Sequence, residues 1–187
     1  MIDVIFTDEC KQRIRERKVW KKDLKISDSI RNEFGWDYHM NMMDSHPEKM
    51  QVWNTDKMKV SLNSFHSRPS APDFAKEVFR QLNETFVDDR GGEQHITNIV
   101  FYGFGPKSLS YPRHKDRMDV FLVQVLGDVP IRLGVTEIPR DDDVKHILRP
   151  GECLWIPRGT YHHLTPDVSR ITYSFAVEKG DDPSTYI

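Results

Sequence analysis

Hydrophobic and polar positions divide the chain into two regions of different texture that meet near residue 94. The clearest helical pattern runs from Ser70 to Phe86, where apolar residues recur at spacings of three and four. Ser70 is suited to cap this helix, and Pro72 and Asp73 suit its first turn. The pattern predicts an amphipathic helix whose apolar face is formed by Phe74, Val78, Phe79, Leu82 and Phe86.

The N-terminal residues predict two shorter elements. Ile2–Phe6 is apolar enough to form a short strand. Thr7 followed by two acidic residues is typical of a helix start, because its hydroxyl can accept a backbone N–H and acids complement the helix dipole. We therefore expect a helix to begin directly after Thr7.

Residues 11–25 are strongly basic, with eight Lys or Arg against Glu16 and Asp23. Such a segment is usually a solvated helix face or loop, and the alternative is a surface that binds phosphate or acidic groups. Residues 34–58 are rich in Trp, Met and aromatic side chains without a clean period. They are expected to pack under the rest of the fold, with a wall of a substrate pocket as the alternative.

From residue 95 onward the chain consists of short apolar runs, β-branched or aromatic, separated by Gly and Pro. This pattern predicts an antiparallel β-sandwich or barrel with the N-terminal helices packed on one face. We expect one domain over residues 1–187, in which 1–94 are helical and mixed and 95–178 form the β core. The predicted strands cover residues 96–104, 120–126, 131–135, 153–156 and 171–177.

Composition narrows the function classes. A chain of 187 residues is long enough for one domain. Its formal net charge of −2 argues against a polybasic nucleic-acid binder. We expect no membrane span and no secretory signal, because no apolar run is long enough and the N-terminus lacks a basic segment. Cys10 and Cys153 cannot form a disulfide framework, so a cytoplasmic protein is expected, and a homodimer is compatible with the sequence.

Two groups of residues could carry metal chemistry. In His114-Lys115-Asp116 the outer residues point the same way on an extended chain, so both could bind one metal. His162-His163 follows two Pro/Gly turns that flank an apolar strand, which would return the chain to the same end of a β-barrel. Two histidines and one carboxylate form the facial ligand set of non-haem iron oxygenases, with positions open for other ligands.

The sequences around these groups resemble a known family. Residues 114–127 are similar to the core motif of the JmjC and cupin-like (cupin-8) dioxygenases, which include ribosomal-oxygenase-type and asparaginyl hydroxylases. Residues 148–162 look like the second motif of that family, and 171–175 look like its last barrel strand. The resemblance implies a double-stranded β-helix (jelly roll, cupin) that holds Fe(II) and uses 2-oxoglutarate and O2.

By position, the resemblance implies that His114, Asp116 and His162 are the metal ligands. His163 and Asp119 are the less favoured neighbours. The family usually binds the distal carboxylate of 2-oxoglutarate with Lys or Arg about fifteen residues after the first ligand, where this chain has Val129. The remaining candidates for the co-substrate are the cations Arg132 and Arg170 and the hydroxyl-bearing residues Tyr111, Thr172 and Ser174.

Three functions are compatible with these residues. The first is an Fe(II)- and 2-oxoglutarate-dependent dioxygenase that hydroxylates or demethylates a substrate C–H, with a protein or peptide side chain as the favoured substrate. The second is a metal-binding cupin that does not use 2-oxoglutarate, such as a small-molecule dioxygenase, isomerase or binder. The third is a non-catalytic relative that kept only the fold.

Overall fold

The computed structural model describes residues 2–26, 28–45, 47, 50–54, 59–63, 71–86, 95–105 and 110–178. Its helices are α1 (Asp8–Arg15), α2 (Asp28–Glu33), α3 (Trp36–Ser45) and α4 (Asp73–Thr85). Its strands are β1 (Trp20–Asp23), β2 (Met50–Asn54), β3 (Lys59–Asn63), β4 (His95–Gly103), β5 (Asp119–Leu126), β6 (Val129–Gly134), β7 (Val144–Leu148), β8 (Glu152–Ile156), β9 (Tyr161–Leu164) and β10 (Arg170–Glu178).

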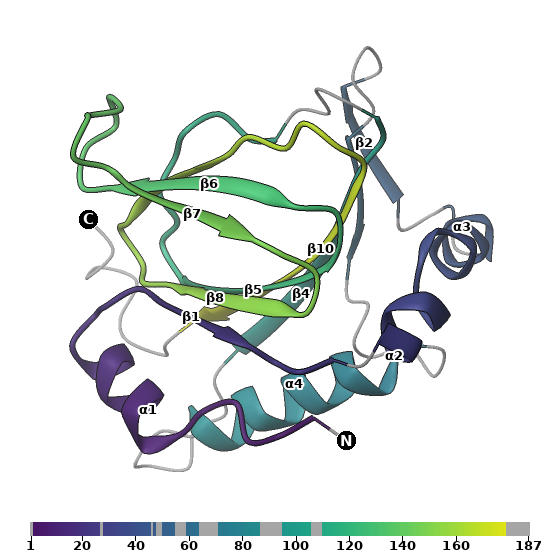
Figure 1. Ribbon diagram of the computed structural model, residues 1–187, viewed down its shortest axis with the longest axis horizontal. Helices are drawn as coiled ribbons and strands as arrows, with labels where there is room; N and C mark the ends of the chain where they lie inside the picture. Colours follow the sequence, from purple (N-terminus) through teal and green to yellow (C-terminus); the bar gives the residue numbers. More distant parts are fainter. Residues whose placement is uncertain are drawn as a thin grey trace.

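Two antiparallel sheets form the centre of the molecule. The large sheet has the order β1-β8-β5-β10-β4-β3-β2, and the small one has the order β7-β6-β9. The chain alternates between them, because β5, β8 and β10 lie in the large sheet while β6, β7 and β9 lie in the small one (Figure 1). This is the double-stranded β-helix expected from the sequence.

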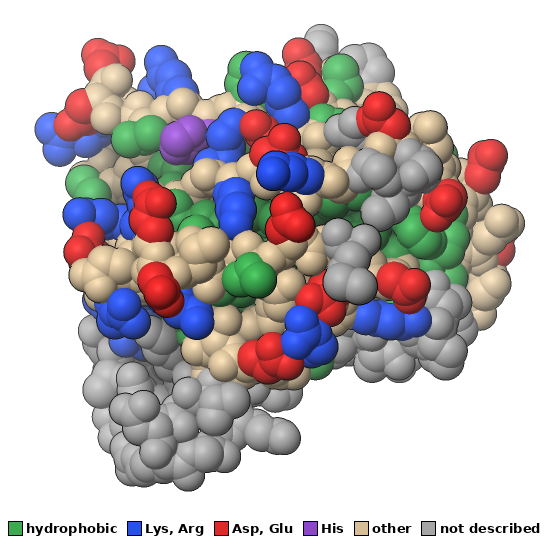
Figure 2. All heavy atoms as spheres, turned by 60° about the horizontal axis from the view of Figure 1, so that its bottom comes forward, with side chains coloured by type: hydrophobic (Ala, Val, Ile, Leu, Met, Phe, Trp, Pro, Cys, Tyr) green, Lys and Arg blue, Asp and Glu red, His purple; other side chains and the backbone are tan. Residues whose placement is uncertain are grey.

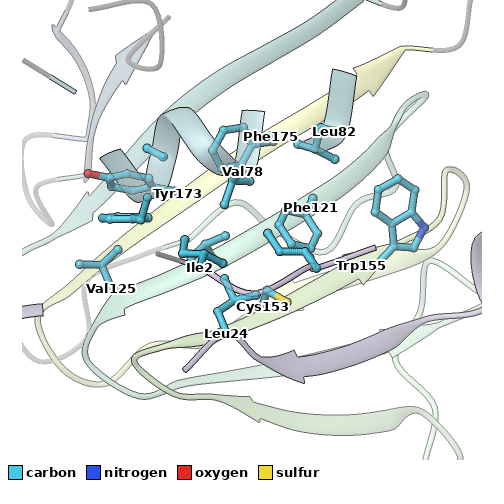
Figure 3. Close-up of a cluster of buried hydrophobic side chains, with 14 of the residues drawn as sticks. Ile2, Leu24, Val78, Leu82, Phe121, Val125, Cys153, Trp155, Tyr173 and Phe175 are labelled. Atoms are coloured by element: carbon cyan, nitrogen blue, oxygen red, sulfur yellow. The ribbon is translucent and has the colours of Figure 1, made fainter. Parts of the chain in front are cut away.

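Helices cover the outer side of the large sheet (Figure 1). The apolar face of α4 lies against β5 and β10, where Val78 and Leu82 are close to Phe121, Tyr173 and Phe175 (Figure 3). All five of these side chains are fully buried. Full burial of each such side chain stabilises the fold by about 1.5–3 kcal/mol, so this layer is the main core.

A second apolar cluster fills the space between the two sheets. It contains aliphatic side chains from β5, β6, β7, β8 and β9, including the fully buried Val129 and Leu148. The two sides of β5 therefore belong to two different cores, because alternate residues of a strand face opposite ways. The helices α1 to α4 all precede residue 94, and the stretch with Trp36, Met42 and Met43 packs in the first core, as expected for packing under the barrel.

The N-terminal region differs from the sequence expectation in its strands. Ile2–Phe6 forms no strand, although Ile5 and Phe6 are buried. Instead β1, β2 and β3 extend the large sheet, and β7 and β9 complete the small one. These five segments are only four or five residues long, so their strand conformation depends on pairing with a neighbour.

The two helix starts also differ from each other. Thr7 caps α1 by accepting the N–H of Cys10 at 3.4 Å, as predicted. Helix α4 begins at Asp73, and its cap position is Pro72 without a side-chain hydrogen bond. Ser70, the predicted cap, lies outside the described residues.

The basic segment 11–25 contributes the second half of α1 and all of β1, and several of its cations have partners within the fold. Lys18 lies 2.7 Å from Glu16, and Lys21 lies 2.8 Å from Glu152. Lys22 donates to the carbonyls of Val4 and Ile5. Figure 2 shows Lys and Arg interspersed with Asp and Glu on the face that carries the lower side of Figure 1. Among the described residues, no helix is long and apolar enough to cross a membrane.

A buried polar group lies between α3 and the large sheet. The side chain of His39 is fully buried, with Nδ1 2.8 Å from the Tyr102 hydroxyl and Nε2 3.1 Å from the Tyr173 hydroxyl. A neutral imidazole has one donor and one acceptor nitrogen, so both contacts are satisfied in the neutral form. Burial lowers the pKa of His39 from 6.5 to about 3.

This pKa shift makes stability depend on pH. Below pH 6.5 the unfolded chain binds a proton at His39, whereas the folded chain resists protonation until about pH 3. The contribution of His39 is therefore fully present above pH 6.5 and is lost as the pH falls toward 3, by at most about 1.4 kcal/mol per pH unit. The free energy of unfolding, measured with urea at several pH values between 7 and 4, should decrease less steeply with falling pH in His39→Gln than in the wild-type chain. Equal slopes would contradict this assignment.

Candidate metal centre and adjoining cavity

The backbones of His114 and His162 meet in a two-bond bridge between the end of the small sheet and the segment that precedes β5. The N–H of His114 donates to the carbonyl of His162 at 3.1 Å, and the N–H of His162 donates back at 2.7 Å. Side chains of such directly opposed residues lie on the same side of the pair. The two imidazole ring centroids are accordingly 4.3 Å apart.

The hydrogen bonds of both rings fix which nitrogen is free. His114 Nδ1 lies 2.8 Å from the Pro112 carbonyl, and His162 Nδ1 lies 3.1 Å from the Thr160 carbonyl. A carbonyl can only accept, so each Nδ1 donates its proton, and in the neutral ring each Nε2 then presents a lone pair. These Nε2 atoms lie 3.5 Å and 3.4 Å from the two carboxylate oxygens of Asp116.

The three side chains can therefore bind one metal ion. His114, Asp116 and His162 each offer one ligand atom, and these atoms lie within 4.8 Å of one another. Burial lowers the pKa of His162, which favours the neutral imidazole that a metal needs. Asp116 is held through its backbone, because its carbonyl accepts the N–H of Gly159 at 3.0 Å. Gly159 has φ of +81°, a conformation that glycine adopts readily.

The neighbouring candidates have other roles. Asp119 accepts the backbone N–H of Arg158 at 2.7 Å and so holds the turn between β8 and β9. His163 is half-buried and lies opposite Arg132 in the register of β9 with β6. Since alternate residues face opposite sides of a strand, His163 points away from the side that His162 occupies.

A cavity of about 330 Å³ adjoins the three ligands. Its volume is in the range of small-molecule sites. On β10, four alternate residues face it: Arg170, Thr172, Ser174 and Ala176. The cavity is also lined by Ile99, Phe101, Ser110, Tyr111, His114, Asp116, Met118, Val120, Leu122, His162 and Leu164.

Arg170 places a buried cation in this mostly apolar cavity. Its side chain is 1% exposed, and burial lowers its pKa to about 10, so it stays charged at neutral pH. One terminal nitrogen donates to the Thr172 hydroxyl at 3.0 Å and the other lies 3.5 Å from the Ser110 hydroxyl. In the described part of the chain, no carboxylate lies within ion-pair distance of Arg170, and its Nε has no hydrogen-bond partner. A buried charge without a counter-charge is costly, so an anionic ligand would be stabilising here.

A buried glutamine orients Thr172. The side-chain nitrogen of Gln124 donates to the carbonyls of Leu126 at 2.6 Å and Gly127 at 2.8 Å. Its oxygen therefore faces the Thr172 hydroxyl, which donates to it at 2.7 Å. A β-bulge in the pairing of β10 with β5 sets Thr172 opposite Gln124. The hydroxyl of Thr172 is thus an acceptor for Arg170, and its proton is committed to Gln124.

Four of the five candidates for co-substrate binding line the cavity: Tyr111, Arg170, Thr172 and Ser174. Arg132 does not, because it occupies an outward position of β6, between the buried Ile131 and Leu133. Its guanidinium instead donates to the Arg140 carbonyl at 3.1 Å.

Sequence reasoning missed Ser110 and Gln124. Gln124 does carry a signal, because it interrupts the apolar, buried run Val120–Val125 of strand β5. A buried polar side chain needs hydrogen-bond partners, so such a residue points to an internal network. Ser110 carries no comparable signal.

Comparisons with known proteins agree with this architecture. The JmjC domain family matches residues 74–181. Among solved structures, the chain is similar to the ribosomal oxygenase YcfD from Escherichia coli, with a TM-score of 0.52 and 22% identity over 68% of this chain. It spans 33% of the length of that protein. A comparison with curated proteins found no match.

Two prolyl hydroxylases match over more of their length. The Pseudomonas putida prolyl-4-hydroxylase has a TM-score of 0.65 and 14% identity, over 91% of this chain and 97% of that protein. The Trichoplax adhaerens prolyl hydroxylase, in complex with a hypoxia inducible factor peptide fragment, has a TM-score of 0.63 and 12% identity, over 90% and 86%. At these identities the likeness establishes a shared fold.

The ligand geometry predicts which side chains a divalent metal needs. Titration of metal-free protein with Co(II), followed by its visible absorption, should show one site in the wild-type chain. We expect His114→Ala, Asp116→Ala and His162→Ala each to abolish it. Asp119→Asn is the matched control and should bind Co(II) normally, because an amide oxygen can still accept the Arg158 N–H. Unchanged binding in His114→Ala would contradict the assignment.

Proposed function

Because this chain belongs to the JmjC domain family, we propose that it is an Fe(II)- and 2-oxoglutarate-dependent dioxygenase that oxidises a C–H bond of a protein or peptide side chain. One observation supports this most strongly. Three candidate metal ligands and a buried arginine that has no carboxylate partner among the described residues line the same cavity. A 2-keto dicarboxylate can satisfy both, since it has a chelating end for a metal and a carboxylate for a cation.

The donor set fits ferrous iron. Two neutral imidazole nitrogens and one carboxylate are the ligands of non-haem Fe(II) oxygenases, and they leave positions open on the metal. His114 and His162 would contribute Nε2, and Asp116 would contribute a carboxylate oxygen. When bound, the iron supplies the oxidising chemistry with O2 and 2-oxoglutarate.

Arg170 would bind the distal carboxylate of 2-oxoglutarate. A planar guanidinium with unused donors suits a carboxylate, and such charge-assisted hydrogen bonds are stronger than neutral ones. The position where the family usually has a cation holds Val129, which is fully buried between the sheets. Arg170 on β10 offers the charge that Val129 cannot, so a function without 2-oxoglutarate gains no support from Val129.

The other side chains around the cavity would exclude water and contact the co-substrate. Ile99, Val120 and Leu122 contribute apolar surface, which keeps water from competing for the charged groups. Ser110 lies beside Arg170, and the ring of Tyr111 packs edge-on to His114 with 5.5 Å between ring centroids. We infer that Tyr111 and Ser174 contact the co-substrate between its two ends.

A protein or peptide substrate is supported by two relatives of the fold. The Escherichia coli relative is a ribosomal oxygenase, and the Trichoplax prolyl hydroxylase is in complex with a peptide fragment. Hydroxylation and demethylation both begin with oxidation of a C–H bond, so the same site could serve either.

The proposal predicts a spectroscopic change. Anaerobic titration of the Fe(II) protein with 2-oxoglutarate should give a saturable visible charge-transfer band. Arg170→Met should raise the half-saturating concentration at least tenfold, because it removes the buried counter-charge. Arg149→Met, which alters an exposed arginine near Asp128, is the control and should titrate like the wild type. Iron-loaded wild-type protein without any band would point to a metal-binding cupin that does not use 2-oxoglutarate.

The hydroxyl of Thr172 should matter through Arg170. Thr172→Val removes the acceptor that orients the guanidinium and leaves Gln124 unsatisfied, so we expect weaker 2-oxoglutarate binding with unchanged Co(II) affinity. Thr172→Ser keeps the hydroxyl and should bind 2-oxoglutarate like the wild type. Both variants can be compared in the same titration, and equal behaviour of Val and Ser would refute this role.

A further inference from the structure

The segment that carries His114 and Asp116 has little backbone support. Residues 110–118 form no strand apart from the bridge at His114. Within the described ranges, the backbone contacts that hold it are the two hydrogen bonds with His162 and the bond from Gly159 to Asp116. None of these bonds holds the described residues 110–113, so the chain just before His114 depends on side-chain contacts for its position.

Arg113 anchors the opposite side of this segment. Its side chain is 6% exposed, and its terminal nitrogens lie 3.0 Å and 3.1 Å from the two carboxylate oxygens of Asp143, which is 2% exposed. Its Nε donates to the Thr136 carbonyl at 3.0 Å. Through this guanidinium, Arg113, the residue before His114, contacts both ends of the loop between β6 and β7.

The loop is built around this ion pair. Asp143 also accepts the backbone N–H of Arg140 at 3.3 Å. Gly134, the last residue of β6, leaves the room that the pair needs. A Cβ there would lie 2.1 Å from an Asp143 oxygen and 2.4 Å from an Arg113 nitrogen. The close fit indicates that the position of Arg113 is fixed from three sides.

We propose that Arg113 and Asp143 are positioning residues for the metal ligand His114. Arg113 directly precedes His114 in the chain, so anchoring its side chain to Asp143 and Thr136 restricts how the backbone at His114 can turn. This inference rests on the proposed metal site and adds a support for it outside the cavity. A lysine would not replace Arg113, because it lacks the fork that bonds to Asp143 and Thr136 together.

Asp143 also balances charge. The guanidinium of Arg113 lies directly beside the segment that would bind a dication. Its pairing with the buried Asp143 carboxylate offsets this charge, and the Nε of Arg132 lies 3.8 Å from the same carboxylate. Asp143→Asn would leave Arg113 charged without a full counter-charge and should therefore weaken cation binding.

The test compares metal affinity with stability. We expect Arg113→Met, Arg113→Lys and Asp143→Asn to weaken Co(II) binding by about 10–100-fold, the range typical of residues that orient metal ligands. Val78→Ala, a core change on α4 far from the ligands, is the stability control. It should lower the free energy of unfolding without altering Co(II) affinity in the folded protein. A merely structural role for Arg113 would give the pattern of Val78→Ala.

Several outcomes separate the two proposals. If the wild-type chain binds no Co(II), the metal site itself is refuted. If the wild type binds and the folded variants bind equally well, or if Arg113→Lys restores full affinity, the positioning role is refuted. Should the single variants fail to fold, the double variant Arg113→Met/Asp143→Leu removes both charges together and avoids an unpaired buried ion. Its Co(II) affinity, measured by the same absorption, is expected to fall by a similar factor.

Discussion

The two-bond bridge between His114 and His162 is the contact on which the candidate site depends. It joins two segments separated by β5 to β8, and it brings together the rings whose Nδ1 protons are already bound to backbone carbonyls. Because the carbonyls fix both rings, the lone pairs of the Nε2 atoms converge with Asp116 before any metal arrives. Such pre-organisation lowers the cost of binding, since little side-chain freedom remains to be lost.

Strand β10 serves two environments at once. Arg170, Thr172 and Ser174 line the cavity, whereas Tyr173 and Phe175 lie in the core beneath the helices. The period of two keeps the polar row and the apolar row apart along the same strand. The packing of α4 on one side thereby supports the position of the buried cation on the other.

Much of this architecture could be predicted from residue patterns, and the exceptions have physical causes. The helix α4 and the long inner strands show the periodicity of buried faces. Strands β1, β2 and β3 were not predicted, because segments of four or five residues give little periodic signal and their conformation depends on pairing with a neighbouring strand. Arg132 and Arg170 are chemically alike, and they differ in which face of their strand they occupy: Arg170 faces the cavity, whereas Arg132 faces outward. The pairing of Arg113 with Asp143 left no mark in the sequence, since it arises from the folding of a loop.

The pairing of β1 with β8 has a consequence for how the chain reaches this state. Trp20 lies opposite Trp155, and the two indole rings are stacked with 6.3 Å between centroids. A ribosome adds about 5–20 residues per second, so Trp20 waits on the order of ten seconds for its partner. During that time, Trp20 and the neighbouring Phe6 lack the surface that buries them. Chaperones that shield apolar segments of nascent chains would have their main task at this stage.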